Sequence, residues 1–329
     1  MKFAFTEEQE MLRSQARSFL GERFGGERVA ELADSPEGWD PASWAQLAEL
    51  GWLGVSLPEE AGGAGLGFLE EAVVFEELGR ALYPGPFFST VALALPALPR
   101  ELQTEVAAGE ARWSVSLDGS LVPDLALVER VLVVRDGTLL AVPAEGETLE
   151  TLDGTRRFGR LREGLDGEEV GSAEALESAR PRVLAALALE ALGVAQRALE
   201  LGLEHAGSRE QFGRPIGVYQ GVSHPLADTY VETELARSLA YWAAWCVAEG
   251  DEQAAVAAAA AKSYGAEAAV SACERSIQIH GGIGFTWEHI LHRLYKRAQW
   301  IEAFAGFPAT HRADVAHALL QAAAPVAAA

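Results

Sequence analysis

The chain has 329 residues, of which 49% are apolar and 22% charged, and its 48 acidic and 26 basic side chains give a formal charge of −22. This composition predicts a soluble globular protein with a sizeable core, divided into two or three domains. A strongly negative surface repels phosphate backbones and anionic lipids, so we exclude nucleic acid and anionic membranes as partners. An anionic ligand therefore needs local arginines or helix N-termini.

The cysteines and histidines predict no metal site and no disulfide framework. Cys246 and Cys273 are the two cysteines, and they show neither a C-x-x-C pair nor a zinc-like Cys/His spacing. The N-terminus lacks an apolar segment of signal-peptide type, and the longest Ala/Val run, 254–261, is too short to cross a bilayer. We expect a cytoplasmic protein with both cysteines buried and reduced.

The first third of the chain predicts helices. Thr6 and Gln9 have capping-box spacing ahead of an apolar face, and Asp40 followed by proline starts a second helix that stops at Gly51. Apolar spacing predicts two more helices, at about 68–82 and 99–109.

Near Trp113 the apolar period changes from 3.6 toward 2, which indicates a domain boundary. The turn dipeptide Asp136-Gly137 predicts a hairpin between its flanking apolar runs. The predicted strands are 113–117, 125–128, 131–134 and 139–142. Farther along, Ala- and Leu-rich segments predict helices at about 174–206, 219–249, 251–279, 287–304 and 308–323.

These elements define an α+β chain that is predominantly α. We expect an N-terminal helical domain at 1–110, a reduced middle β domain at 111–172 and a C-terminal antiparallel helix bundle at 173–329.

Four segments in order resemble the acyl-CoA dehydrogenase family. They are Gly51-Trp-Leu-Gly-Val-Ser-Leu-Pro-Glu-Glu60, Phe75-Glu-Glu-Leu-Gly-Arg-Ala-Leu82, Ser208-Arg-Glu-Gln-Phe-Gly-Arg-Pro-Ile-Gly217 and Gln278-Ile-His-Gly-Gly-Ile-Gly-Phe285. The resemblance implies an acyl-CoA dehydrogenase-like fold in which FAD lies between the β domain and the bundle and reaches into a neighbouring subunit.

The same resemblance implies which residues contact FAD. Arg209 matches the family's pyrophosphate-binding arginine, and the other matching positions are Gln211, Phe212, Gln220, Gln278, Gly281 and Gly282. A forked, permanently charged guanidinium suits a diphosphate on an acidic protein, and glycines let the backbone approach a ligand closely. The alternatives are a solvated cation at a helix end for Arg209 and a plain helix C-cap for the glycines.

The reaction implied is α,β-dehydrogenation of an acyl-CoA thioester, in which a carboxylate removes the α-proton while a hydride goes to the flavin. Aligned on the family's usual motif, Ala305 occupies the position of the catalytic glutamate. At the family's other base position stand Val183 and Leu184, or Arg182 if the alignment shifts. None of these side chains can accept a proton. Glu302 and Glu190 are the weak candidates, each with an alternative as a solvated or ion-paired residue.

The middle domain also departs from the family. The flavin-binding Thr-Glu-Pro stretch is missing, because the chain after Trp113 reads Ser-Val-Ser-Leu-Asp-Gly-Ser. The segment Leu152-Asp-Gly-Thr-Arg-Arg-Phe158 resembles the closing strand of that domain.

Three functions follow from this pattern. The first is an FAD-dependent acyl-CoA dehydrogenase with an atypical base, acting as a homodimer or homotetramer and passing electrons to electron-transferring flavoprotein. The second is a catalytically weak subunit that completes the FAD site in a heteromer with a glutamate-bearing homologue. The third is a non-redox scaffold on the same fold.

Overall fold

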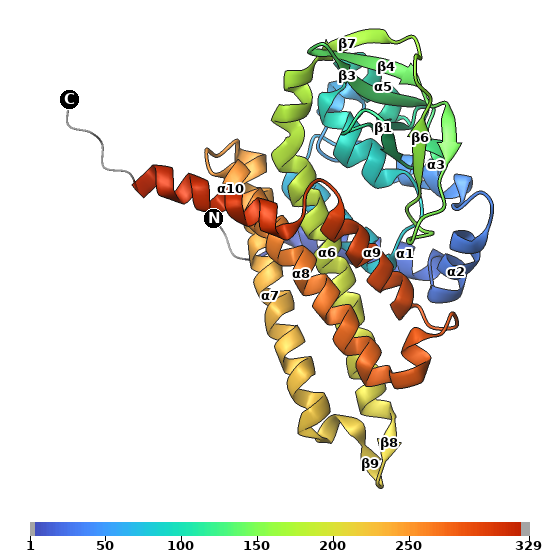
Figure 1. Ribbon diagram of the computed structural model, residues 1–329, viewed down its shortest axis with the longest axis vertical. Coiled ribbons are helices and arrows are strands. Elements are labelled where there is room, and N and C mark those ends of the chain that lie inside the picture. Colours follow the sequence, from blue (N-terminus) through green and yellow to red (C-terminus); the bar gives the residue numbers. More distant parts are fainter. Residues whose placement is uncertain (1–3, 324–329) are drawn as a thin grey trace.

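The computed structural model describes residues 4–323. Helices form the two ends of the sequence, and the strands lie between them (Figure 1). The N-terminal helices are α1 (Glu7–Arg23), α2 (Gly26–Asp34), α3 (Pro41–Glu49), α4 (Phe68–Ala81) and α5 (Arg100–Ala107), with short 3₁₀ turns η1 (Trp52–Gly54), η2 (Glu59–Ala61) and η4 (Leu95–Ala97) and the π-helix η3 (Phe88–Ala94).

The predicted helix starts are confirmed. Thr6 and Gln9 form the reciprocal capping box of α1, with Oγ1 of Thr6 3.2 Å from the Gln9 amide. Asp40 caps α3 by accepting from the Ala42 amide at 3.0 Å, and a proline opens the helix.

The β region contains two small sheets. One has the order β1 (Trp113–Val115), β3 (Arg130–Arg135), β4 (Thr138–Pro143), β7 (Glu168–Ser172), and the other has the order β2 (Leu121–Pro123), β6 (Phe158–Leu161), β5 (Gly146–Thr148). The predicted hairpin is β3–β4, and both turn residues, Asp136 and Gly137, have positive φ. β1 pairs with β3 in parallel, and the other pairs are antiparallel.

Two strand predictions are wrong. Leu125–Leu127 is a 3₁₀ turn, η5, because Asp124 adopts left-handed φ and ends the extended chain. Within the segment expected to close the domain, only Phe158 enters a strand, since Asp153 and Thr155 hydrogen-bond each other in a buried turn. The last strand of the four-stranded sheet is instead β7, which lies at its edge beside β4.

The C-terminal part is a helix bundle. Its elements are α6 (Ala173–Ser208), a small hairpin of β8 (Glu210–Gln211) and β9 (Arg214–Pro215), η6 (Ile216–Val218), α7 (Gln220–Glu249), α8 (Ala254–His280), η7 (Gly281–Phe285), α9 (Leu291–Ala303) and α10 (Pro308–Ala323). The expected helix at 287–304 begins four residues later than predicted, at Leu291. In Figure 1, α6 runs the length of the molecule from the β sheets to the β8–β9 hairpin, and α10 projects to one side.

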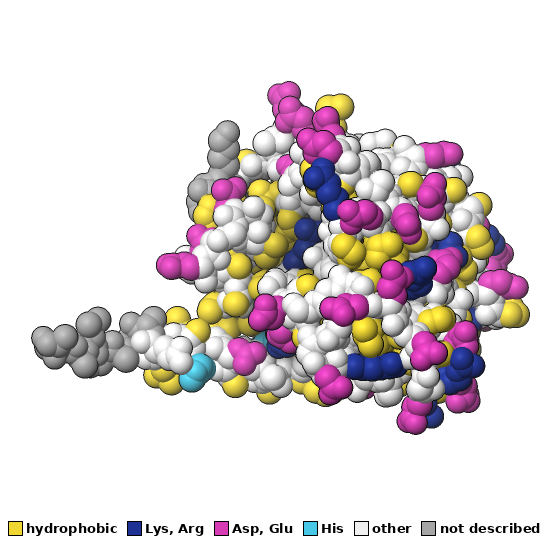
Figure 2. Space-filling model, turned by 90° about the horizontal axis from the view of Figure 1, so that it is seen from above, with side chains coloured by type: hydrophobic (Ala, Val, Ile, Leu, Met, Phe, Trp, Pro, Cys, Tyr) yellow, Lys and Arg dark blue, Asp and Glu magenta, His cyan; other side chains and the backbone are white. Residues whose placement is uncertain are grey.

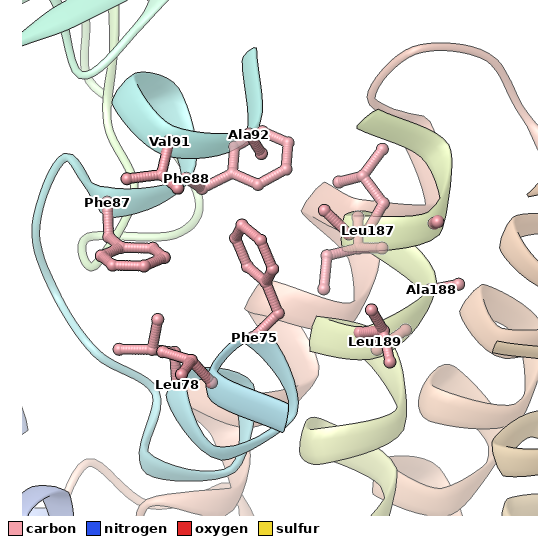
Figure 3. Packing of buried hydrophobic residues seen from close by; sticks show 14 of the residues in the cluster. Phe75, Leu78, Phe87, Phe88, Val91, Ala92, Leu187, Ala188 and Leu189 are labelled. Atoms are coloured by element: carbon pink, nitrogen blue, oxygen red, sulfur yellow. The ribbon is translucent and has the colours of Figure 1, made fainter. Parts of the chain in front are cut away.

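One hydrophobic core joins the N-terminal helices to the bundle. Figure 3 shows Phe75 of α4 pointing between Phe88 of η3 and Leu187 of α6, with Leu78 on the side of Phe87. Both cysteines lie in this core as free thiols, as the sequence predicts.

Acidic side chains outnumber basic ones, 48 to 26. Among residues 4–323, no helix has the length and apolarity that a membrane span requires. Seen from the end that carries the sheets, carboxylate side chains are scattered over the face with few basic side chains between them (Figure 2).

Candidate functional site

A pocket of about 590 Å³ lies where the β region meets the start of α6 and the turn after α9. Its lining includes Ala305 and also Val183 and Leu184, so both positions at which a base is expected face the same cavity. Ser116, Asp118 and Gly119 from the β region complete one wall. The cavity therefore has an apolar residue or an alanine at each place where proton abstraction needs a carboxylate.

The turn that carries Ala305 has an unusual backbone. Ala305 has φ of 58° and Gly306 has φ of 111°, so the chain reverses sharply after α9. Buried Lys262 of α8 donates to the carbonyl of Glu302 at 2.9 Å and to the carbonyl of Gly306. His311 of α10 contacts the Gly306 carbonyl through Nε2 at 3.1 Å. These bonds hold Ala305 against the pocket.

The two weak base candidates lie elsewhere. Glu190 is 2% exposed and forms a bidentate ion pair with Arg156 at 2.6 and 2.7 Å, so its carboxylate is fully engaged inside the core. Glu302 sits on the last turn of α9 and is not among the residues that line the pocket. The ion-paired alternative that the sequence left open for Glu190 matches the structure.

Arg182 also has a structural partner. Its guanidinium lies 2.6 Å from the carboxylate of Glu71, which is completely buried, and 2.6 Å from the Ser56 hydroxyl. The carboxylates that do line the pocket are Asp118 and Glu177. Asp118 accepts from the amides of Ser120 and Leu121, and both carboxylates are solvent-exposed. Sequence reasoning missed Glu177, because the first turns of α6 match no motif.

Two serines of the β region, Ser116 in the pocket wall and Ser114 of β1, have hydroxyls that already donate hydrogen bonds. Ser114 donates to the carbonyl of Pro123 at 2.7 Å, and Ser116 donates to that of Leu121 at 3.4 Å. These serines occupy the stretch where hydrogen-bond donors to a flavin ring are expected. Both hydroxyl protons are used in hydrogen bonds within the β region, so neither is available to a flavin ring.

A second cluster of predicted site residues lies at the opposite end of the bundle. Arg209 follows the last residue of α6, Gln211 and Phe212 belong to the β8–β9 hairpin, and Gln220 begins α7. The Arg209 amide donates to the carbonyl of His205 at 2.9 Å, and within residues 4–323 its exposed guanidinium has no hydrogen-bond or ion-pair partner. Phe212 has φ of 53° and a side chain that is 92% exposed.

The glycine bend approaches the same end from α8. Gln278 is exposed on the last turn of α8, and Gly281 has φ of 64°, so this glycine caps the helix as the plain alternative expects. A Cβ added to Gly281 or Gly282 would meet nothing within 4 Å, so the backbone here is open to a ligand. The imidazoles of His205 and His280 stack with centroids 4.2 Å apart, which brings the end of α6 beside the bend.

The two clusters are far apart within one chain. Val183 precedes the end of α6 at Ser208 by roughly 25 residues, which is about 38 Å of helix. The helix α6 therefore places the guanidinium of Arg209 and the pocket of the same chain at opposite ends of the bundle.

Comparisons with known proteins match this architecture. Residues 6–100 fit the family described as acyl-CoA dehydrogenase, N-terminal domain, and residues 174–320 fit acyl-CoA dehydrogenase, C-terminal domain. The chain is 36% identical over 299 residues to acyl-CoA dehydrogenase IpdE2 of Mycobacterium tuberculosis, covering 89% of this chain and 91% of that protein.

Two solved structures extend the match. A variant of the Tcur3481-Tcur3483 steroid ACAD has a TM-score of 0.88 and 30% identity, covering 97% of this chain and 99% of the other. The ChsE4-ChsE5 complex of Mycobacterium tuberculosis has a TM-score of 0.89 and 26% identity, covering 98% and 99%. The chain belongs to the acyl-CoA dehydrogenase family, whose members bind FAD.

Proposed function

We propose that this chain is a subunit of a heteromeric, FAD-dependent acyl-CoA dehydrogenase. Its Arg209 end binds the ADP half of an FAD whose flavin lies in a glutamate-bearing homologue. The observation that carries this proposal is the pocket in which Ala305, Val183 and Leu184 occupy both expected base positions.

The geometry along α6 supports a shared cofactor. Arg209 has a free guanidinium among the described residues, and it lies about 38 Å of helix away from the pocket of its own chain. A diphosphate bound there belongs to a flavin in another chain. Gln211, Phe212, Gln220, Gln278, Gly281 and Gly282 would surround the same ADP half, and the open space at the glycines fits a ligand there.

The chemistry of the pocket supports a partner that supplies the base. FAD, when bound, would supply an acceptor for the β-hydrogen as hydride, and a carboxylate base must take the α-proton of the thioester. Glu190 is tied to Arg156 in the core, and Glu177 is exposed to water, which leaves it without the desolvation that makes a carboxylate a stronger base. We therefore infer that residues 4–323 offer no suitably placed proton acceptor and that the partner supplies one.

The names of similar proteins agree with this arrangement. Two similar structures are named as pairs of different chains, and one of them is called a steroid ACAD. We therefore propose an acyl-CoA thioester as the substrate class, include a steroid-derived acyl group among the test substrates, and propose electron-transferring flavoprotein as the acceptor. The second candidate, an autonomous dehydrogenase, is favoured only by the two exposed carboxylates in the pocket, Asp118 and Glu177.

The test compares the chain alone with the chain co-expressed with a glutamate-bearing homologue. We expect little flavin and no activity from the chain alone, and bound FAD with bleaching by acyl-CoA from the pair. Arg209→Ala in the pair should lower FAD content, since it removes a charge-assisted contact of about 1.5–3 kcal/mol. A yellow, active isolated chain would refute the proposal in favour of the autonomous enzyme.

The Ala305→Glu variant separates a missing base from a missing flavin site. Glutamate has the same backbone cost as alanine at this left-handed position. We expect no dehydrogenase activity from the isolated variant. The hydroxyls of Ser114 and Ser116 donate within the sheet, so they are not available to hold a flavin ring in the pocket. A gain of activity would mean that the chain holds flavin by itself.

A further inference from the structure

Three histidines lie in contact at the end of the bundle that carries Arg209. The rings of His205 and His280 stack with centroids 4.2 Å apart and an angle of 25° between planes. The ring of His289, which follows η7, lies 4.5 Å from that of His280 at an angle of 52°. The resemblance to the family assigns no role to these three imidazoles, and none of them stands at an expected position of the catalytic base. We call the three rings the histidine stack.

Hydrogen bonds fix which ring nitrogens are available. Nδ1 of His280 is 2.8 Å from the carbonyl of Ser276, and because a carbonyl only accepts, Nδ1 is the protonated nitrogen. Nε2 of His280 is then the nitrogen that gains a proton when the ring becomes cationic. Nδ1 of His289 accepts from the amide of Leu291 at 3.3 Å, so its Nε2 carries the proton in the neutral ring.

The surroundings of the stack oppose positive charge. Burial, the neighbouring His280 and Arg209 lower the pKa of His205. Burial, the other two imidazoles and Arg197 lower the pKa of His289, against a smaller opposing effect of Glu204. His205 and His289 are therefore both disfavoured as cations, and the Arg209 guanidinium, on the residue whose amide donates to the His205 carbonyl, has no partner among the described residues.

We propose that His205, His280 and His289 form, with Arg209, a proton-linked binding site for the diphosphate of a nucleotide cofactor. The inference rests on the proposed function, because it takes the ADP half of FAD as the ligand. A diphosphate brings negative charge next to His205 and His289, whose pKa values are lowered in its absence, and opposite charge favours the protonated form. Protonation turns Nε2 of His280 into a donor for a charge-assisted hydrogen bond.

The coupling between proton binding and cofactor binding has a definite sign. If the complex holds more protons on the stack than the free protein does, cofactor affinity rises as the pH falls, by up to about tenfold per pH unit for one proton. The rise is confined to the range between the pKa values of the free and the bound forms. A purely structural stack, neutral in both states, gives no such dependence.

The experiment measures FAD binding between pH 5.5 and 8.5 on the flavin-depleted assembly of this chain with its glutamate-bearing homologue. Calorimetry in buffers with different ionisation enthalpies counts the protons taken up by the unmutated protein. We expect net proton uptake and tighter binding at lower pH. Free pyrophosphate should compete with FAD, and its competition should strengthen as the pH falls.

Variants assign the effect to the stack. His280→Asn keeps a donor near the Ser276 carbonyl but removes the imidazole, and it should leave affinity at pH 8.5 within twofold while flattening the pH dependence. Arg209→Gln should weaken binding at every pH and keep the slope. His224→Gln, an exposed histidine on α7 outside the stack, is the matched control and should keep both.

The outcomes separate this inference from the proposed function. FAD binding that takes up no proton, or a slope that survives in His280→Asn, overturns the role of the stack and leaves the proposed function standing. Failure of the assembly to bind FAD at any pH overturns both.

Discussion

Lys262 and Gly306, 44 residues apart in the sequence, are joined by a hydrogen bond from the buried ammonium to the backbone carbonyl. The same ammonium donates to the carbonyl of Glu302 at the end of α9. One side chain from α8 therefore fixes the turn that presents Ala305 to the pocket.

Replacing this ammonium should loosen that turn. Burial lowers the pKa of Lys262 to about 8, so the side chain is charged at pH 7 and supplies charged donors to both carbonyls. Lys262→Met should lower the free energy of unfolding by about 1–2 kcal/mol, because it leaves buried acceptors with fewer donors. Denaturant unfolding measures the loss, and amide exchange should accelerate at residues 304–306. Unchanged stability and unchanged amide exchange would contradict the inference that Lys262 fixes this turn.

Glu190 should behave as a structural residue. Its partner Arg156 is 2% exposed and also lies over the rings of Phe88 and Trp300, at 4.6 and 4.8 Å from their centroids. Glu190→Gln leaves this guanidinium buried without its counter-charge and should cost about 3–5 kcal/mol of stability. The double variant Arg156→Met, Glu190→Leu should recover much of that loss. A stable Glu190→Gln protein whose assembly loses only its rate of flavin reduction would instead identify Glu190 as the base.

The crossing of α4 and α6 depends on glycine. A Cβ on Gly193 would lie 2.0 Å from the carbonyl oxygen of Glu76, and one on Gly79 would lie 2.3 Å from that of Glu190. Gly193→Ala should therefore separate the helices and cost about 1–3 kcal/mol or more. Gly207→Ala is the matched control in the same helix, where a Cβ meets nothing within 4 Å, and it should stabilise by up to about 1 kcal/mol. Equal melting temperatures for the two variants would contradict the packing argument.

Asp124 should destabilise the protein at neutral pH. Burial raises its pKa to about 6, above the 3.8 of an ordinary aspartate, so between these values the folded protein binds more protons than the unfolded chain. Stability therefore falls as the pH rises through this range. Asp124→Asn removes the charge and should stabilise at pH 7 by at most about 3 kcal/mol.

The control for Asp124 is Asp136, which has a similar left-handed φ of 50° but is exposed in the hairpin turn. Asp136→Asn should change stability by less than about 0.5 kcal/mol. The gain from Asp124→Asn should disappear near pH 3.5, where the wild-type carboxyl is already protonated. A gain that persists there would point to hydrogen bonding with Ser89 as its cause.

Local signals predicted much of the fold. Capping residues placed α1 and α3, and the Asp136-Gly137 dipeptide placed the β3–β4 hairpin, because these features depend on neighbouring residues. The π-helix Phe88–Ala94 and the 3₁₀ turn at Leu125 escaped prediction, since tertiary packing and the left-handed Asp124 decide them.

For the candidate site too, the sequence predicted some features and only the fold shows the others. The resemblance to the family identified Ala305 and Val183 as the positions without a base, but only the fold brings them to one pocket. The partner of Glu190 and the stack of His205 on His280 join residues far apart in the sequence. No spacing rule on one element predicts such contacts.

The length of α6 also affects how many flavins the proposed assembly would bind. In the proposed heteromer, each chain offers one Arg209 end and one pocket, and the two would belong to different cofactors. The number of flavins would then be set by how many chains have a competent pocket, and some Arg209 ends would remain without a nucleotide. A chain can then lose its chemistry and still be indispensable to its neighbour.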